Sequence, residues 1–257
     1  MAHWLQTPAG RYLLAWEQAR LDETVADIFG FHALQLGLPE LQALRGNRMP
    51  HRWIALDAET PLPAAPAGSA PIAAPLRCDF DALPLDGQSL DLVVLPHTLE
   101  LARDAHRALR EVERVLRPEG RVVILGFNPH SLWGLRQGLG RLGQRATPRS
   151  ARPLYLPSQG DLIGHRRLRD WLRLLSFEIE GERFGCYRPP FESAQWLSRF
   201  GWLERGGARW WTVFGAVYCV VAVKRVRGMR LVGLAREQRT LPKAAPLVVG
   251  NSSKDSA

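Results

Sequence analysis

The residues with the clearest chemical potential follow a short apolar run, residues 89–96, in which Val and Leu dominate. A run without polar alternation is typical of a strand that is buried on both faces. His97 and Glu100 come directly after it, and ligands of parallel sheets bind outside the carboxyl ends of the strands. Because the ordinary pKa of histidine lies near neutrality, we predict His97 and Glu100 as candidate catalytic residues, with His97 as a general base. The alternative is a histidine that only caps a helix or lies in a loop.

This apolar run begins a strand–helix–strand unit. Asp104 precedes a segment that has apolar residues at the helical period on one face and arginines and glutamates on the other. Pro118 and Gly120 are expected to end this helix, since neither residue readily continues one. Residues 121–127 then form a second buried strand, and a crossover of this kind joins parallel strands. The sequence therefore predicts an α/β fold with a parallel sheet.

Two stretches within residues 83–120 resemble a known enzyme family. They are Leu83-Pro-Leu-Asp-Gly-Gln-Ser-Leu-Asp91, before the first strand, and Ala108-Leu-Arg-Glu-Val-Glu-Arg-Val-Leu-Arg-Pro-Glu-Gly120, on the helix. In combination they look like the middle of a class I S-adenosylmethionine-dependent methyltransferase, closest to the small-molecule, type 11-like group. The resemblance implies a Rossmann-like, seven-stranded, mostly parallel sheet with an antiparallel last strand and helices on both faces. It also implies S-adenosylmethionine as the cofactor.

The resemblance places the cofactor at the loop after a strand predicted for residues 31–36. Gly37 begins this loop, and a glycine there lets the backbone approach the cofactor. The family usually has an acidic residue before a loop of three glycines, whereas this chain has Gln35, one glycine, Leu38 and Pro39. Gln35 and Gly37 are therefore cofactor-binding candidates in a degenerate loop. Either cofactor binding is altered in this chain or it has been lost.

Further cofactor-binding candidates follow the next strands. Asp57 ends a strand predicted for residues 52–56, and an acid about twenty residues beyond the glycine loop holds ribose hydroxyls through its two oxygens. The alternative for Asp57 is a surface acid that opens a loop. By the resemblance, Asp79 would accept a hydrogen bond from the adenine amine while Phe80 packs on the ring; Asp81 is an alternative acid. The resemblance adds two residues at the end of the strand at 89–96: Leu95 and Pro96.

The rest of the pattern predicts the remaining elements. Apolar residues at helical spacing predict helices at residues 11–29, 40–45, 160–176 and 193–205. Strands are predicted at residues 76–79, 177–184 and 210–224, the last two forming a hairpin. A literal G-x-G-x-x-G at residues 138–143 lies inside a helical leucine pattern and does not follow a strand, so we do not interpret it as a dinucleotide-binding sequence.

We predict three parts of the chain. Residues 1–30 form an N-terminal helical extension packed on the core, and residues 31–227 form the methyltransferase-like domain. Residues 228–257 form a basic tail that we expect to be disordered. A Trp-rich insertion at residues 188–209 either packs against the core, caps a hydrophobic substrate or touches a membrane. Residues 60–75, rich in Pro and Ala, are expected to be a linker.

The composition of the chain indicates which partners and which cellular compartment to expect. The net charge of +9 indicates either an anionic partner, such as nucleic acid or a phospholipid surface, or only an arginine-rich background. Nucleic acid is not favoured, because aromatic residues do not alternate with the basic ones. The three cysteines are too widely spaced for a disulfide framework or a metal pattern. We expect no transmembrane segment and no signal peptide, and hence a cytoplasmic protein.

The leading functional hypothesis is a methyltransferase that uses S-adenosylmethionine to modify a small or lipid-like molecule. Methyl transfer from a sulfonium requires alignment and exclusion of water more than strong acid–base groups, so it needs no conspicuous catalytic cluster. One alternative is a non-catalytic binding module that keeps the fold and has lost the cofactor. Another is a methyltransferase that acts on nucleic acid.

Overall fold

The computed structural model describes residues 1–57, 76–146, 154–157 and 160–225 of the 257-residue chain. The linker expected at residues 60–75 and the tail expected at residues 228–257 lie outside the described residues. The chain divides into two units, Met1–Val226 and Arg227–Ala257, and all described residues belong to the first.

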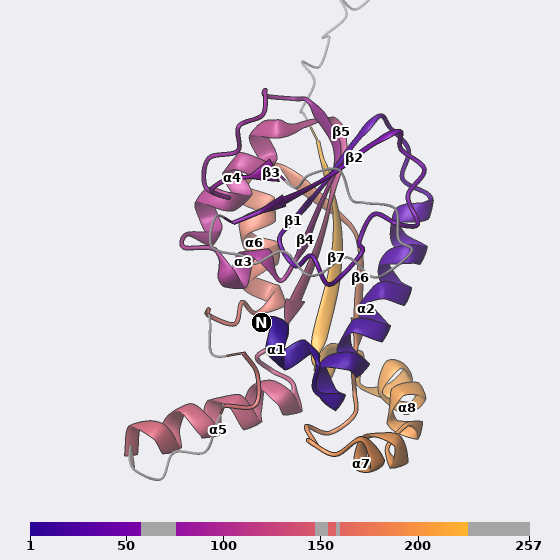
Figure 1. The fold of residues 1–257 in the computed structure, drawn as a ribbon, viewed down its shortest axis with the longest axis vertical. Helices are drawn as coiled ribbons and strands as arrows, with labels where there is room; N and C mark the ends of the chain where they lie inside the picture. The colour runs from indigo at the N-terminus through magenta and orange to yellow at the C-terminus, as the bar shows by residue number, and fades with distance from the viewer. Residues whose placement is uncertain (58–75, 147–153, 158–159, 226–257) are drawn as a thin grey trace, which may run out of the picture. The chain divides into compact units, whose positions relative to one another are not determined.

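A seven-stranded sheet forms the centre of the first unit, with the strand order β3-β2-β1-β4-β5-β7-β6 (Figure 1). The strands are β1 (His32–Leu36), β2 (His51–Leu56), β3 (Leu76–Arg77), β4 (Leu90–Pro96), β5 (Leu116–Phe127), β6 (Phe177–Gly185) and β7 (Val217–Lys224). The strands β1 to β5 pair in parallel, whereas β7 is antiparallel to both of its neighbours, β5 and β6. The predicted α/β class and the antiparallel last strand are therefore confirmed.

Helices cover both faces of this sheet. They are α1 (Ala2–Leu5), α2 (Pro8–Ala26), α3 (Thr98–Leu101), α4 (Ala105–Val115), α5 (Leu132–Ala146), α6 (His165–Leu174), α7 (Ala194–Arg199) and α8 (Trp202–Trp210), with a 3-10 turn, η2 (Thr212–Phe214). Side chains alternate along a strand, so Leu92 and Val94 of β4 pack with α2 on one face. Val93 and Leu95 pack with α4 and α6 on the other.

The helix α2 begins at Pro8, three residues before the predicted residue 11, and ends at Ala26, whereas α4 begins directly after Asp104, as predicted. In both helices a side chain satisfies free N–H groups of the first turn. The Thr7 hydroxyl accepts from the Gly10 amide and Pro8 occupies the first position of α2. The Asp104 carboxylate accepts from the amides of His106 and Arg107 at the start of α4. The unit on which the resemblance rests is thus present, although β5 already begins at Leu116 and includes the predicted Pro–Glu–Gly stop.

The helix predicted at residues 40–45 is wrong, because this segment forms turns between β1 and β2. The Gln35 side-chain amide donates to the carbonyls of Gly37, Leu38 and Leu41, and its oxygen accepts from the Ala43 amide. These backbone groups therefore bond to a side chain instead of to a helical ladder.

The Trp-rich insertion also differs from its prediction. The helix expected at residues 193–205 is divided into α7 and α8, with the break at Phe200 and Gly201. The strand expected at residues 210–224 begins only at Val217, since its pairing partner β5 ends at Phe127, opposite that residue. Residues 210–214 instead end α8 and form η2. The helix expected at residues 160–176 is shorter, and the G-x-G-x-x-G lies inside α5, as expected.

Candidate functional site

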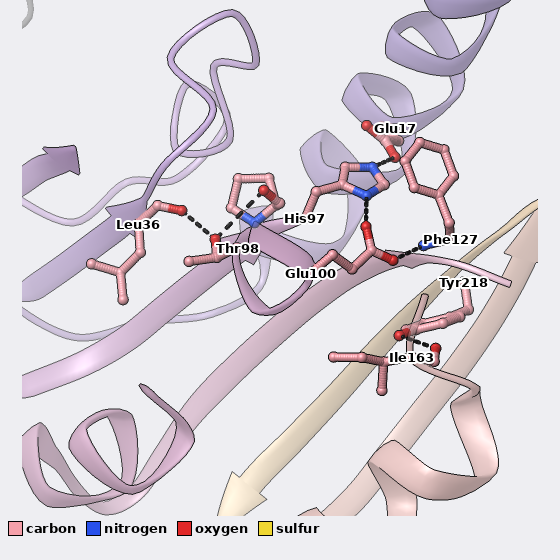
Figure 2. Close-up of polar contacts among 9 residues, drawn as sticks. Glu17, Leu36, His97, Thr98, Glu100, Phe127, Ile163 and Tyr218 are labelled. Carbon is pink, nitrogen blue, oxygen red and sulfur yellow. Dashed lines mark hydrogen bonds and ion pairs between the residues drawn. The ribbon is translucent and has the colours of Figure 1, made fainter. Parts of the chain in front are cut away.

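A buried cluster of one histidine and two glutamates lies at the carboxyl end of β4 (Figure 2). His97 directly follows β4 and has a left-handed backbone conformation, φ 55°, which begins the short helix α3. Its Nδ1 lies 2.8 Å from Glu100 Oε2 in α3, and its Nε2 lies 2.7 Å from Glu17 Oε1 in α2. All three side chains are buried. The structure thus brings together both predicted catalytic residues and adds a third.

The Glu17–His97–Glu100 cluster connects several elements of the fold. Glu100 Oε1 accepts from the Phe127 amide, at the end of β5, at 2.5 Å. The ring of Phe127 packs on the His97 ring with 4.3 Å between centroids. Next along the chain, the Thr98 hydroxyl donates to the Leu36 carbonyl at the end of β1 (Figure 2). The cluster therefore fixes the loop after β4 against β1, β5 and α2.

The electrostatics of the cluster favour a charged imidazole. Burial alone lowers the pKa of His97, but the carboxylates of Glu17 and Glu100 together raise it to about 10. Each ring nitrogen faces a carboxylate oxygen, so both act as donors and the ring is an imidazolium. Burial raises the pKa of Glu100, although the imidazolium and the Phe127 amide oppose this. Glu17 Oε2 is buried and has no hydrogen-bond partner within the described part of the chain.

Glu17 was missed as a site residue, although the sequence contains a signal for it. Leu13, Glu17 and Leu21 are spaced four residues apart and share one helix face, and both leucines are completely buried. An acid in the middle of a buried apolar stripe needs a partner, since an unpaired buried charge is costly. The position of Glu17 in this stripe therefore predicts a buried cation or hydrogen-bond donor that faces its carboxylate.

Gly37, the first residue of the degenerate loop, lies where the ends of β1, β2 and β4 meet. Its φ of +77° is a conformation that favours glycine, and its amide donates to the Ala55 carbonyl of β2 at 2.7 Å. A Cβ added at Gly37 would lie 3.6 Å from both Phe80 Cζ and Thr98 Oγ1. The structure thus brings Gly37 and Phe80 together, as the resemblance implies.

The two candidate acids follow adjacent strands on the same edge of the sheet. Asp57 is half-buried directly after β2, and Asp79 is exposed two residues after β3. The residues that precede the two acids are hydrogen-bonded to each other, since the Cys78 amide donates to the Leu56 carbonyl. Burial, followed by the charges of Asp79 and Asp57, raises the pKa of the Cys78 thiol. Leu95 and Pro96 end β4 with buried side chains.

The remaining candidate, Gln35, has a different environment from the acid of the usual loop. Its side chain is buried, and its amide makes the four hydrogen bonds to the backbone of residues 37–43 that prevent a helix there. Its nitrogen and oxygen are therefore used within the loop. Gln35 shapes the loop and presents no free polar atom to a ligand.

An apolar pocket of about 580 Å³ opens beyond the carboxyl end of β5. Its lining is mainly apolar and aromatic and includes Pro129, Leu132, Leu135, Tyr187, Trp211 and Phe214, together with the polar residues His130 and Ser131. Among the described residues, no group of three or more His, Cys, Asp and Glu is placed to hold a metal ion. No helix in that part of the chain is long and apolar enough to cross a membrane.

Comparison with known sequences gives a family match for the middle of the chain. Residues 40–124 match the family described as a methyltransferase domain. The uncharacterized protein YafS of Escherichia coli (strain K12) is 30% identical over 178 residues, which cover 68% of this chain and 65% of that protein. A malonyl-[acyl-carrier protein] O-methyltransferase of Halorhodospira halophila is 40% identical over 73 residues, 27% of this chain and 25% of that enzyme. The matched regions thus span less than two thirds of both relatives.

Solved structures match over most of the chain at low identity. The complex between the Haloferax volcanii Trm112 methyltransferase activator and a putative methyltransferase contains a chain with a TM-score of 0.54 and 16% identity. This similarity covers 88% of the present chain and 96% of that chain. An S-adenosylmethionine-dependent methyltransferase of Mesorhizobium loti has a TM-score of 0.51 and 16% identity, over 80% of this chain and 96% of that one. These similarities show a shared fold.

Proposed function

Because the chain belongs to the class I S-adenosylmethionine-dependent methyltransferase family, we propose that it transfers the methyl group of this cofactor to a small, lipid-like molecule. The observation that carries the proposal is the convergence at the carboxyl ends of the strands. Gly37, with its φ of +77°, faces Phe80, and Asp57 lies on the same edge of the sheet. Ligands of open α/β sheets bind at this edge.

The residues present fit the adenosine half of the cofactor. Asp57 would accept from the ribose hydroxyls, and Asp79 would accept from the adenine amine. Phe80 would pack on the adenine ring, and Gly37 leaves room for the backbone to approach, since no side chain stands there. When bound, the cofactor supplies an electrophilic methyl group on a sulfonium. Gln35 would support this site by holding the loop, while Leu95 and Pro96 would form its floor.

We assign His97 and Glu100 a positioning role. Both ring nitrogens of His97 are hydrogen-bonded to carboxylates, and the ring of Phe127 packs against the imidazole. His97 therefore has no free lone pair that could accept a proton from a substrate. What the cluster does instead is hold the end of β4 and the end of β5 together through Glu100. A methyl transfer depends on such alignment more than on a strong base.

The apolar pocket beyond β5 supports a lipid-like acceptor. Its lining is mostly leucine, proline and aromatic side chains and offers few polar partners, which suits a hydrophobic molecule. The Halorhodospira halophila relative is named as a malonyl-[acyl-carrier protein] O-methyltransferase. A relative from Chlamydia pneumoniae, 37% identical over 54 residues (21% of this chain and 24% of that protein), is named as a demethylmenaquinone methyltransferase. We place the reaction in the cytoplasm, where three free cysteines remain reduced.

One observation favours a second candidate, a non-catalytic module of the same fold. The loop after β1 contains one glycine, and its backbone is bonded to Gln35 instead of opening a helix whose N-terminus faces the cofactor. A chain that had lost the cofactor would retain the fold and the apolar pocket. The module would bind a hydrophobic molecule without methylating it.

Methyl-labelled S-adenosylmethionine distinguishes the two candidates. The purified chain is incubated with this cofactor and a bacterial lipid extract, and label in the organic phase is counted. If the chain is a methyltransferase, the label in the organic phase should rise with time. In Asp79→Ala the label should fall at least about tenfold, because one hydrogen bond to a charged group is lost. Asp170→Ala, which changes an exposed acid on α6, is the matched control and should retain activity. Label at the level of boiled protein would support the module.

A further inference from the structure

A stripe of four leucines on α5 faces solvent. Leu132, Leu135, Leu139 and Leu142 are 52–61% exposed. Their spacing of three, four and three residues puts them on one side of the helix. The opposite side is packed against the protein, with Trp133 and Gln137 each 1% exposed. A helix that served only the core would have its leucines inward and its glutamine outward.

The inner side of α5 is fixed by specific hydrogen bonds, so the leucines cannot turn toward the core. The Trp133 indole donates to the Arg188 carbonyl at 2.7 Å, and Gln137 Oε1 accepts from the Leu156 amide at 2.9 Å. The Arg136 guanidinium pairs with Glu192 at 2.5 Å, close to α7. The outward direction of the leucines is therefore a property of how α5 is anchored.

A second exposed apolar group continues the stripe. Trp210 and Trp211, at the end of α8, are 76% and 59% exposed, and Val213 and Phe214 of η2 are also exposed. Trp211 and Phe214 line the same pocket as Leu132 and Leu135, so the two groups meet. Figure 1 shows α5 and α8 at the same end of the sheet. We call this surface the apolar rim: Leu132, Leu135, Leu139, Leu142, Trp210, Trp211, Val213 and Phe214.

The charges around the apolar rim are positive. The sequence of α5 contains three arginines and no acidic residue. Arg205 and Arg209 precede the exposed tryptophans in α8. The acid of α8, Glu204, points inward, where it accepts from the amides of Cys186 and Tyr187. An apolar surface with a cationic border matches the boundary between acyl chains and anionic headgroups.

We propose that the apolar rim docks on the surface of an anionic phospholipid bilayer. Leucines and indole rings enter the boundary between headgroups and acyl chains, where tryptophan is favoured because one end is apolar and the other polar. The arginines pair with lipid phosphates. The pocket between α5 and η2 then opens toward the bilayer, which gives a hydrophobic molecule a path from lipid. The docking itself does not depend on the proposed methyl transfer.

Vesicle flotation with the full chain tests the proposal. Vesicles of phosphatidylcholine alone are compared with vesicles that also contain phosphatidylglycerol, at low and high salt. We expect the chain to float with the anionic vesicles, and less with the neutral ones or at high salt. We also expect a blue shift of tryptophan fluorescence on binding. No flotation with anionic vesicles at millimolar lipid would overturn the proposal.

Variants separate the apolar rim from simple charge attraction. In Leu139→Gln/Leu142→Gln the surface loses two leucines, and lipid affinity should fall by about tenfold or more. Leu174→Gln, on α6, changes a leucine that is 81% exposed and should bind as the wild type does. All three residues are exposed, so the fold tolerates the changes.

Two results would assign the apolar rim to something else. If the double variant binds vesicles like the wild type, charge elsewhere on the chain explains the attraction. Light scattering could instead show that the wild type is a dimer, that the double variant is a monomer, and that vesicles do not displace the dimer. The apolar rim would then be the interface with a second copy of the chain. Either result overturns bilayer docking.

Discussion

Glu17 Oε1 lies 2.7 Å from His97 Nε2, although 80 residues separate the two side chains in the sequence. This contact joins the N-terminal helix α2 to the loop after β4, at the edge of the sheet where a ligand of this fold binds. Residues 1–30 are therefore connected to the candidate site by a buried ion pair.

Glu17→Ala should destabilise the protein strongly. Removing one carboxylate leaves the His97 imidazolium buried with a single partner, and breaking a buried ion pair costs about 3–5 kcal/mol of unfolding free energy. Glu17→Gln keeps a hydrogen-bond acceptor at the same place and should cost less. Urea denaturation measures both variants. A loss below about 0.5 kcal/mol for Glu17→Ala would show that the pair contributes nothing.

The pH dependence of stability should reveal the same cluster. The pKa of His97 is raised to about 10 in the folded chain from an ordinary 6.5, so the stabilisation is complete below pH 6.5. It is then lost as the pH rises from 6.5 through about 10, by at most about 1.4 kcal/mol per pH unit for one proton. The raised pKa of Glu100 acts in the same direction.

Urea denaturation between pH 6.5 and 9.5 tests this dependence. Glu17→Gln serves as the comparison, because one of the charges that raise the pKa of His97 is absent in it. The wild type should lose more stability across this range than Glu17→Gln. Parallel curves would show that His97 does not titrate there.

Gln35→Glu should destabilise the loop even though the family usually has an acid at this position. The Gln35 nitrogen lies 2.8–3.1 Å from the carbonyl oxygens of Gly37, Leu38 and Leu41. A carboxylate there faces three acceptors without a proton to donate, which costs about 2–4 kcal/mol of unfolding free energy. Thermal and urea denaturation measure the loss. A Gln35→Glu protein as stable as the wild type would mean that this network does not hold the loop.

The sheet and α4 were predictable because their signals are local. Apolar runs bounded by turn residues gave the strands, and Asp104 marked the start of α4 with a side chain that caps it. The turns at residues 40–45 were not predictable from periodicity. They depend on Gln35, whose buried amide competes for backbone groups up to six residues away in the chain.

The candidate site was predictable only in part, because some of its contacts join residues that are far apart in the sequence. His97, Glu100 and Gly37 follow strands, so their place at one edge of the sheet follows from topology. The stripe of Leu13, Glu17 and Leu21 indicates that Glu17 is buried, but it does not indicate that the partner is His97, 80 residues away in the sequence. The outward leucines of α5 have helical spacing that predicts the helix, but the spacing does not say which side faces the core.

Gly37→Ala should weaken the site through the backbone. Space is available for the methyl group, since the nearest atoms lie 3.6 Å away, but the φ of +77° strains any L-residue. We expect a loss of about 1–2 kcal/mol in unfolding free energy and weaker cofactor binding. Gly138→Ala in α5 is the matched control, since nothing lies within 4 Å of its added Cβ, and should be neutral or slightly stabilising. Equal effects at both positions would contradict the backbone account.

Calorimetric titration of the full chain with S-adenosylhomocysteine, the product form of the cofactor, tests the central claim most directly. The account predicts saturable binding that weakens by about tenfold in Asp57→Ala and in Asp79→Ala, since each substitution removes hydrogen bonds to a charged group. Asp170→Ala, which changes an exposed acid on α6, should bind as the wild type does. Folded protein that shows no binding up to millimolar ligand would contradict a cofactor site at these residues and leave a methyltransferase fold without its cofactor.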